Sequence, residues 1–359
     1  MSPIFEFKDM IKKGLIAIGL LASTATYAQD FSQYTPGTLA EGVIYYLPKT
    51  QFEIKVKATK VTYTPGELCQ YANRYLRLQN VSSQPNEYWE LQSVQLQTIG
   101  VPDKEKAYGV KLKDKSAASQ VELTESGIVK AINTTAPQEK VAPQEKAAEK
   151  PKRVDPRSFM TEEILLAGST NKMAELIARE IYNIRESKNS LTRGQADYMP
   201  QDGAALKLML NNLETQEKAL TEMFTGFTER TEQTFTFYVE PEKEIKDQVV
   251  FRFSNKLGVV KEDNLAGEPI YISVTNENTL PPANEEEKAK KKLEGIIYNI
   301  PGKASVTIKG NGKQYVNEEV FLTQFGETEV LIDNLFNKKV NTRVIFNTTT
   351  GGIVKIDKD

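Results

Sequence analysis

The stretch EGVIYYLPKTQFEIKVKA, residues 41–58, decides the class of fold, because its second half alternates as a half-buried β-strand does. Phe52, Ile54 and Val56 project to one face of an extended chain, and the residues between them, all charged, project to the other. Further runs of β-branched and aromatic residues follow, separated by turn signals. The sequence therefore predicts an N-terminal β domain over residues 30–135.

The opening of this stretch has an echo near the far end of the chain. EGVIYYLP (41–48) and EGIIYNIP (294–301) share five identities in eight positions, and GIVK occurs at 127–130 and again at 352–355. The two echoes lie farther apart in the N-terminal half than in the C-terminal half, which excludes a simple tandem repeat. Two explanations stay open: two divergent β domains of related plan, or two generic buried strands that end at a proline.

Between the two β-rich segments the composition changes twice. APQEKVAPQEKAAEKPK, at residues 136–152, is too polar to bury a core, and it predicts a disordered linker over 136–157. Residues 158–225 show helical spacing and predict an α-helical hairpin. A C-terminal β domain follows over 226–359, with a charged insertion at 277–293. The predicted fold is α+β and mostly antiparallel β, with two β-rich domains and the hairpin between them in sequence.

Both predicted helices of the hairpin have an apolar face, which they must bury against another part of the chain. The first face comprises Met173, Leu176, Ile177, Ile181 and Ile184, and the second comprises Leu206, Met209, Leu213, Leu220 and Phe224. A short helix is also predicted in ELCQYANRYL, at residues 67–76.

The N-terminus has the pattern of a secretory signal. MIKKGLIAIGLLASTATYAQD (10–30) contains two lysines, a short apolar run and small residues up to Ala28. We therefore predict a signal peptide over residues 1–28, with Met10 as an alternative start and Ala25 as an alternative cleavage position. The apolar run is too short to span a bilayer, and no cysteine near the cleavage position offers a lipid anchor. The expected protein is exported and is not an integral membrane protein.

The composition excludes several kinds of site. The chain has no histidine, which removes Ser-His-Asp catalysis and HExxH zinc sites. Its only cysteine is Cys69, which cannot form an internal disulfide and is expected to be a small buried thiol. Lys and Arg (46) nearly balance Asp and Glu (48), so no overall field attracts nucleic acid. We predict no catalytic, cofactor-binding or metal-binding residues, and we favour a protein without enzymatic activity.

Two short motifs have structural explanations. Ser169 and Lys172 match the S-x-x-K of penicillin-recognising enzymes, but the S-D-N and K-T-G elements of those enzymes are absent. GNGK at 310–313 lacks the spacing of a P-loop and is typical of a hairpin turn.

The loop between the two predicted helices is the first candidate for partner binding, and it contains Arg193, Asp197 and Tyr198. A structural explanation is favoured, in which Gly194 ends one helix, Asp202 caps the next and Arg193 pairs with Asp197. The alternative is a partner-binding loop, since loops on rigid hairpins often carry recognition.

The second candidate is EYWE, which contains Tyr88 and the only tryptophan, Trp89. Neighbouring side chains of a strand face opposite sides, so one of the two belongs to the core and the other lies outside. Core packing is favoured for Trp89, and contact with a glycan or a protein is the alternative.

Several long phrases occur in one order over nearly the whole mature chain, among them YYLPKTQFEIKV, EIYNIRESKNSLTRGQADYMPQDGAALKLML, FRFSNKLGVV and IIYNIPGKASVTI. In this combination the chain resembles an uncharacterised family of secreted proteins from Bacteroides and relatives, the domain of unknown function 4831. The resemblance implies a signal peptide and an exported location in a Gram-negative envelope, in the periplasm or cell envelope. It implies no activity, and it carries over no catalytic or binding residue.

Two hypotheses about function follow. The first is an exported envelope protein with a non-enzymatic role in protein binding or assembly, as a scaffold with an envelope protein as partner. The second is a carbohydrate-binding or carbohydrate-processing envelope protein, because a glycosidase needs only two well-placed carboxylates. An exposed apolar patch on the helical hairpin would favour the first, and a cleft with two carboxylates beside tyrosines would favour the second.

Overall fold

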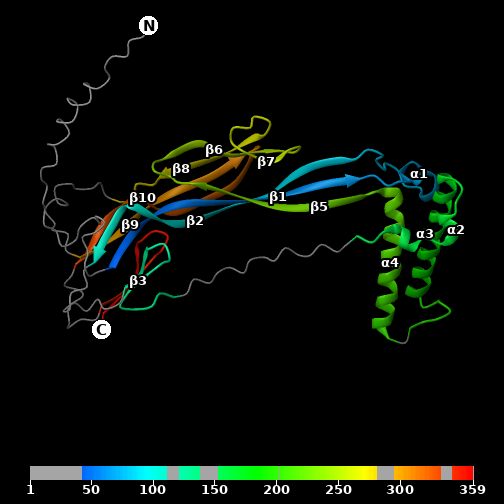
Figure 1. Cartoon of the computed structure of the whole chain (residues 1–359), viewed down its shortest axis with the longest axis horizontal. Coiled ribbons are helices and arrows are strands. Elements are labelled where there is room, and N and C mark those ends of the chain that lie inside the picture. Colours follow the sequence, from blue (N-terminus) through cyan, green and yellow to red (C-terminus); the bar gives the residue numbers. More distant parts are fainter. Residues whose placement is uncertain are drawn as a thin grey trace, which may run out of the picture.

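The computed structural model describes residues 43–110, 121–137, 153–200, 202–280, 295–332 and 342–358 (Figure 1). The predicted signal peptide (1–28), most of the linker, and the charged insertion beyond residue 280 lie outside these residues.

The elements follow the predicted order of strands, helices and strands. The strands are β1 (Val43–Thr64), β2 (Asn86–Val110), β3 (Val121–Leu123), β4 (Val129–Ile132), β5 (Phe227–Val239), β6 (Ile245–Ser254), β7 (Gly258–Val260), β8 (Glu268–Asn276), β9 (Gly295–Gly310), β10 (Lys313–Ile332), β11 (Thr342–Phe346) and β12 (Ile353–Lys358). The α-helices are α1 (Ala72–Leu76), α2 (Glu162–Leu165), α3 (Thr170–Thr192) and α4 (Gly203–Thr225), and two short 3-10 helices are η1 (Cys69–Tyr71) and η2 (Pro156–Phe159).

The described strands form three sheets, in the orders β2-β1-β5, β10-β9-β8-β6-β7 and β12-β11-β4-β3. Their ladders are antiparallel. This confirms the predicted α+β class with mostly antiparallel β structure. The predicted hairpin turn at GNGK joins β9 to β10, with Asn311 and Gly312 both at positive φ, as a tight two-residue turn requires.

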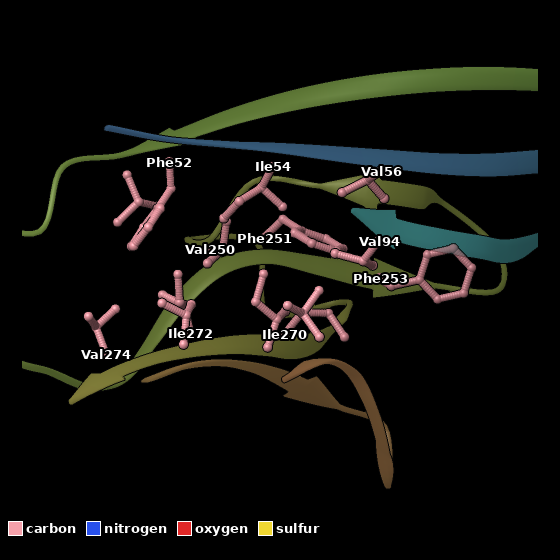
Figure 2. Packing of buried hydrophobic residues seen from close by; sticks show 14 of the residues in the cluster. Phe52, Ile54, Val56, Val94, Val250, Phe251, Phe253, Ile270, Ile272 and Val274 are labelled. Atoms are coloured by element: carbon pink, nitrogen blue, oxygen red, sulfur yellow. The ribbon is translucent and has the colours of Figure 1, made fainter. Parts of the chain in front are cut away.

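The largest core lies between the first two sheets (Figure 2). Phe52, Ile54 and Val56 of β1 are buried and point toward the facing sheet, as their alternation predicted. The charged residues between them stay partly exposed on the other face of β1. The facing sheet supplies the buried side chains of Val250, Phe251, Phe253, Ile270, Ile272 and Val274.

The first sheet is longer than the core that it covers. Residues 59–64 of β1, paired with residues 86–90 of β2 and 227–232 of β5, form what we call the ribbon, whose near end still contacts the core through Trp89. Every residue from Thr228 to Thr234 is exposed, so no second layer covers either face of this part of β5. The ribbon ends at the helices, which form a separate unit with a core of their own (Figure 1).

Strands from the two predicted β domains pair with one another. β1, from the first segment, pairs with β5 from the second over thirteen residue pairs. β4 likewise pairs with β11. The two β-rich segments therefore share sheets, which the predicted domain boundaries did not include.

The two echoing phrases occupy matching places. The described part of each lies at the start of a strand with a partner on both sides, β1 between β2 and β5, and β9 between β10 and β8. In both strands the pairing register slips at the phrase's proline, Pro48 or Pro301, which has no N–H to donate. The N–H of Tyr46 donates to the Gly127 carbonyl at 2.9 Å, and the N–H of the aligned Asn299 donates to the Gly351 carbonyl at 3.2 Å. Gly127 begins the first GIVK, and Gly351 directly precedes the second, so each phrase meets the start of its GIVK echo.

The unequal spacing of the echoes has a simple structural cause. β1 and β2 are joined through residues 65–85, which contain η1 and α1, whereas β9 and β10 are joined by the turn at residues 311–312. The longer connection belongs to the helical unit, so the extra residues lie at the end of the ribbon.

The first phrase also binds the second directly. The Tyr45 hydroxyl donates to the Ile297 carbonyl at 3.0 Å and accepts from the Ile297 N–H at 2.9 Å. β8 covers β9 only from Ala304 onward, so these two groups of Ile297 face Tyr45 instead of a strand. Burial raises the pKa of Tyr45, so its hydroxyl stays protonated and can make both bonds.

Replacing Tyr45 by phenylalanine should leave the N–H and C=O of Ile297 buried without partners. We expect Tyr45→Phe to lower the free energy of unfolding by about 2–4 kcal/mol in urea titrations. The control is Tyr238→Phe, whose exposed hydroxyl is 3.4 Å from Glu53 and whose loss should cost less than about 0.5 kcal/mol. Equal effects of the two substitutions would show that the Tyr45 hydroxyl does not hold β9.

Candidate functional site

The helical unit is fixed to the ribbon by close backbone contact. A Cβ at Gly66 would lie 2.2 Å from the Met223 carbonyl oxygen, and one at Gly226 would lie 2.3 Å from the Thr64 carbonyl oxygen. Gly226 also has φ of 70°, a conformation that favours glycine. The Tyr63 hydroxyl lies 2.9 Å from the Thr225 carbonyl oxygen. The C-terminal end of α4 and the end of β1 are therefore held as one rigid joint.

The break between α2 and α3 explains the S-x-x-K match. The Ser169 hydroxyl accepts from the Lys172 N–H at 3.2 Å and caps α3. This is an N-cap in its ordinary geometry, with the Lys172 ammonium bonded to Glu175 instead of to the serine.

The predicted ends of the hairpin helices are confirmed. Gly194 has φ of 68° directly after α3, and its N–H donates to the Leu191 carbonyl. The Asp202 carboxylate accepts from the Ala205 N–H at 2.7 Å at the start of α4. The structural explanation of this loop holds for both residues.

The third part of that explanation is wrong, because Arg193 and Asp197 form no ion pair with each other within the described residues. Both side chains are exposed, and Tyr198 beside them is 74% exposed. Arg193 is the C-cap of α3, so its backbone serves the helix end and its guanidinium is left in solvent.

The first half of α4 is less buried than its apolar face predicts. Leu220 and Phe224 are fully buried, as predicted, but Met209 of the same face is 37% exposed. Leu208, which the predicted face does not include, is 62% exposed. The facing end of α3 is mostly polar, with Leu191 its one buried residue after Ile184, so it offers little surface to cover α4. We call Tyr198, Leu208 and Met209 together the hairpin tip, since Tyr198 lies in the loop between α3 and α4 and the other two lie in the first turns of α4. Figure 1 shows the end of the hairpin that this loop joins.

The structure does not bring Tyr88 and Trp89 to the interhelix loop. Both lie in the ribbon on β2, opposite Val61 and Lys60 of β1, whereas the loop lies at the free end of the hairpin. Trp89 packs against the sandwich core, as the favoured interpretation predicted. Its ring covers Gly258, where a Cβ would lie 2.8 Å away.

Three neighbouring cavities surround the joint between α4 and β5, with volumes of about 520, 710 and 580 Å³. Glu222 and Phe227 line all three, and Arg153 lines the first two. The sequence did not point to this site, because residues 136–157 have the composition of a linker. Nothing in that segment indicated that Arg153 returns to α4. The last residues of that predicted linker instead pack on α4, where Pro156 is buried at the start of η2.

The described carboxyl groups whose pKa is shifted are all held in the ionised form. The pKa is lowered by a hydrogen bond from Lys172 at Glu175, from Lys309 at Asp247 and from Ser305 at Glu277. Burial raises the pKa of Glu217, but hydrogen bonds from Arg185 and Lys188 outweigh it and the net shift is downward. A glycosidase acid needs the opposite, a raised pKa that keeps the carboxyl protonated.

Cys69 is half-buried, not buried as predicted, because Leu68 takes the interior position one residue earlier. Within the described ranges, no cluster of three or more acidic or cysteine side chains could hold a metal ion. None of the described helices has the length and apolar character needed to cross a membrane.

Fold and site together define an α+β protein in which a helical unit is carried at the end of a β ribbon. The chain belongs to the family described as Domain of unknown function (DUF4831), whose model matches residues 41–354. No curated protein and no solved structure matches the chain.

Because Trp89 is the only tryptophan, its emission reports directly on the contact with Gly258. Gly258→Ala places a methyl group against the ring and strains a residue with φ of 77°. We expect a shifted emission maximum and a loss of about 1–3 kcal/mol beyond the control Gly312→Ala. Gly312 has a similar φ of 67° but open space around it, so the control isolates the backbone cost. An unchanged emission spectrum in Gly258→Ala would contradict this packing of Trp89.

Proposed function

We propose that this chain is an exported protein of a Gram-negative cell envelope that binds another protein and supports its assembly without catalysing a reaction. The observation that carries the proposal is the hairpin tip, where Tyr198 and Leu208 are 74% and 62% exposed. Large exposed apolar side chains near the end of an element favour a partner-binding role.

The placement of the tip supports the same role. The α3–α4 hairpin projects from the end of the ribbon, with its free end away from the sheets (Figure 1). The close contacts of Gly66 and Gly226 leave α4 little freedom to rotate on β1. A rigid support lowers the entropy lost when the tip is bound.

The charges around the tip favour a protein over a lipid surface. Arg193 and Lys207 lie near Asp197 and Asp202 along the loop and the first turns of α4, so both signs are present. Adsorption to an anionic membrane depends on an excess of basic residues, which is absent here. Exposed tyrosine and arginine with neighbouring apolar side chains are typical of the centres of protein interfaces.

A photo-crosslinking amino acid at position 208 should capture the partner in the native envelope. The matched control places the same amino acid at position 265, since Leu265 is 82% exposed but lies on the β7–β8 loop. We expect a reproducible adduct with one protein from position 208 only, and at least about ten-fold less adduct when Met209→Ser is added. Adducts from both positions alike, or none from position 208, would count against the tip as the binding surface.

Export is tested separately by the N-terminus of the mature protein. If residues 1–28 are a signal peptide, the protein recovered from the periplasmic or envelope fraction should begin at Gln29, or at Thr26 if cleavage follows Ala25. Replacing Leu20 and Leu21 by arginine should interrupt the apolar run and keep the uncleaved chain in the cytoplasm. Mature protein that keeps Met1 or Met10 in the envelope fraction would refute cleavage.

A further inference from the structure

Arg153 makes the closest contact between a cation and an aromatic ring in the described part of the chain. Its guanidinium carbon lies 3.6 Å from the centre of the Phe227 ring, against 5.3 Å or more for the other such pairs described. Its Nε also donates to the Glu222 carboxylate at 3.0 Å. Phe227 and Glu222 thus form a clamp with an apolar face and a negative edge, which matches a guanidinium group.

Arg153, which fills the clamp, is not held in place by hydrogen bonds of its own backbone. No backbone hydrogen bond joins Arg153 or Val154 to any described residue, and Val154 is 40% exposed. From Asp155 onward the backbone is anchored, since the Asp155 carboxylate accepts from the Arg157 N–H and Pro156 is buried. The side chain of Arg153 can therefore leave the clamp without unfolding η2.

The space around the clamp suits an extended peptide. Cavities of about 520 and 710 Å³ share Glu222 and Phe227 as wall residues, and the first extends to residues 64–67 and the second along residues 228–231. Glu229 lines both cavities, but the second is also lined by Lys218 and Arg230, so the excess of negative charge is confined to the first. Glu67, on the wall of the first cavity, already pairs with Arg157 at 3.5 Å. The first cavity therefore favours a basic segment.

We propose that Phe227 and Glu222 form a binding site for an arginine side chain on an extended segment of a partner protein, and that Arg153 is a resident occupant which the partner displaces. The site lies on a different surface from the hairpin tip, and the proposal does not rest on the function proposed above. Lysine would fit less well, because a compact ammonium cannot stack flat on the ring while it bonds Glu222 sideways.

Competition by Arg153 should be measurable. A partly exposed ion pair and one cation–ring contact are each weak, so the self-occupied state reduces the apparent affinity for an external arginine by about ten-fold. Removing the Arg153 side chain in Arg153→Ala should raise the apparent affinity by the same factor. Arg179→Ala is the matched control, since Arg179 is also exposed and paired with a glutamate but lies on α3.

The test uses the full chain and a fluorescent peptide of the sequence EKPKRV, residues 149–154, which stops before the anchored residues, with fluorescence anisotropy as the measurement. We expect Arg153→Ala to bind it about ten-fold more tightly than the wild type and than Arg179→Ala. Adding Glu222→Gln or Phe227→Leu to Arg153→Ala should abolish that gain. A peptide with lysine in place of its arginine should likewise show no gain. Circular dichroism checks that each variant is folded, and Glu222→Gln is isosteric should Phe227→Leu unfold the joint.

Three results would overturn the proposal. They are equal affinity of wild type and Arg153→Ala, a gain that survives both Glu222→Gln and the lysine peptide, and no binding to Arg153→Ala at millimolar peptide.

Discussion

The hydroxyl of Tyr45 holds strand β1 against strand β9, and the rest of the β structure depends on this crossing. The hydroxyl bonds both backbone groups of Ile297 at a point where β8 no longer covers β9. Close by, Thr50 and Thr323 exchange backbone-to-hydroxyl bonds at 3.0 and 3.3 Å, and both side chains are buried. Since buried polar groups left without partners are costly, these bonds fix one position of β1 relative to β9 and β10.

A fixed crossing explains the elongated form of the molecule. β1 is pinned to β9 near its start, and its alternating side chains keep it on the sandwich through Val56. It then continues to Thr64, past the end of the facing strands, and carries β2 and β5 with it. Antiparallel ladders need no second layer when their exposed faces are polar, as they are from Thr228 to Thr234. The helical unit is thus held at a distance set by strand length.

Local features of this fold could be predicted, because they depend on residues close in sequence. The alternation through Phe52, Ile54 and Val56 predicted the buried face of β1, and Gly194 and Asp202 predicted the helix ends. Side-chain periodicity says which face is buried but not which strand covers it. The pairing of β1 with β5 and of β4 with β11 therefore could not be predicted, since those partners are far apart in the chain.

The candidate sites likewise combine residues that local sequence could identify with residues that it could not. Tyr198 was identified from its loop, but the exposure of Leu208 and Met209 depends on how little apolar surface the end of α3 offers, which periodicity does not report. Arg153 follows a segment whose composition predicts disorder, so nothing local indicated that its side chain returns to α4.

The two echoing phrases show how one strand pattern can serve two purposes. Both phrases reach across the crossing, Tyr45 to Ile297 and Asn299 to Pro48, and they do so from different aligned positions, since Asn299 aligns with Tyr46. The Asn299 amide donates to the Pro48 carbonyl at 2.9 Å and to the Thr350 carbonyl at 3.0 Å. It therefore satisfies a β1 carbonyl next to the point where the β1–β2 register slips. The tyrosine at position 46 cannot donate twice, and its ring packs over Gly127 instead. The crossing is therefore asymmetric, because the first phrase crosses through the Tyr45 hydroxyl and the second through the Asn299 amide, although both strands share the same apolar pattern.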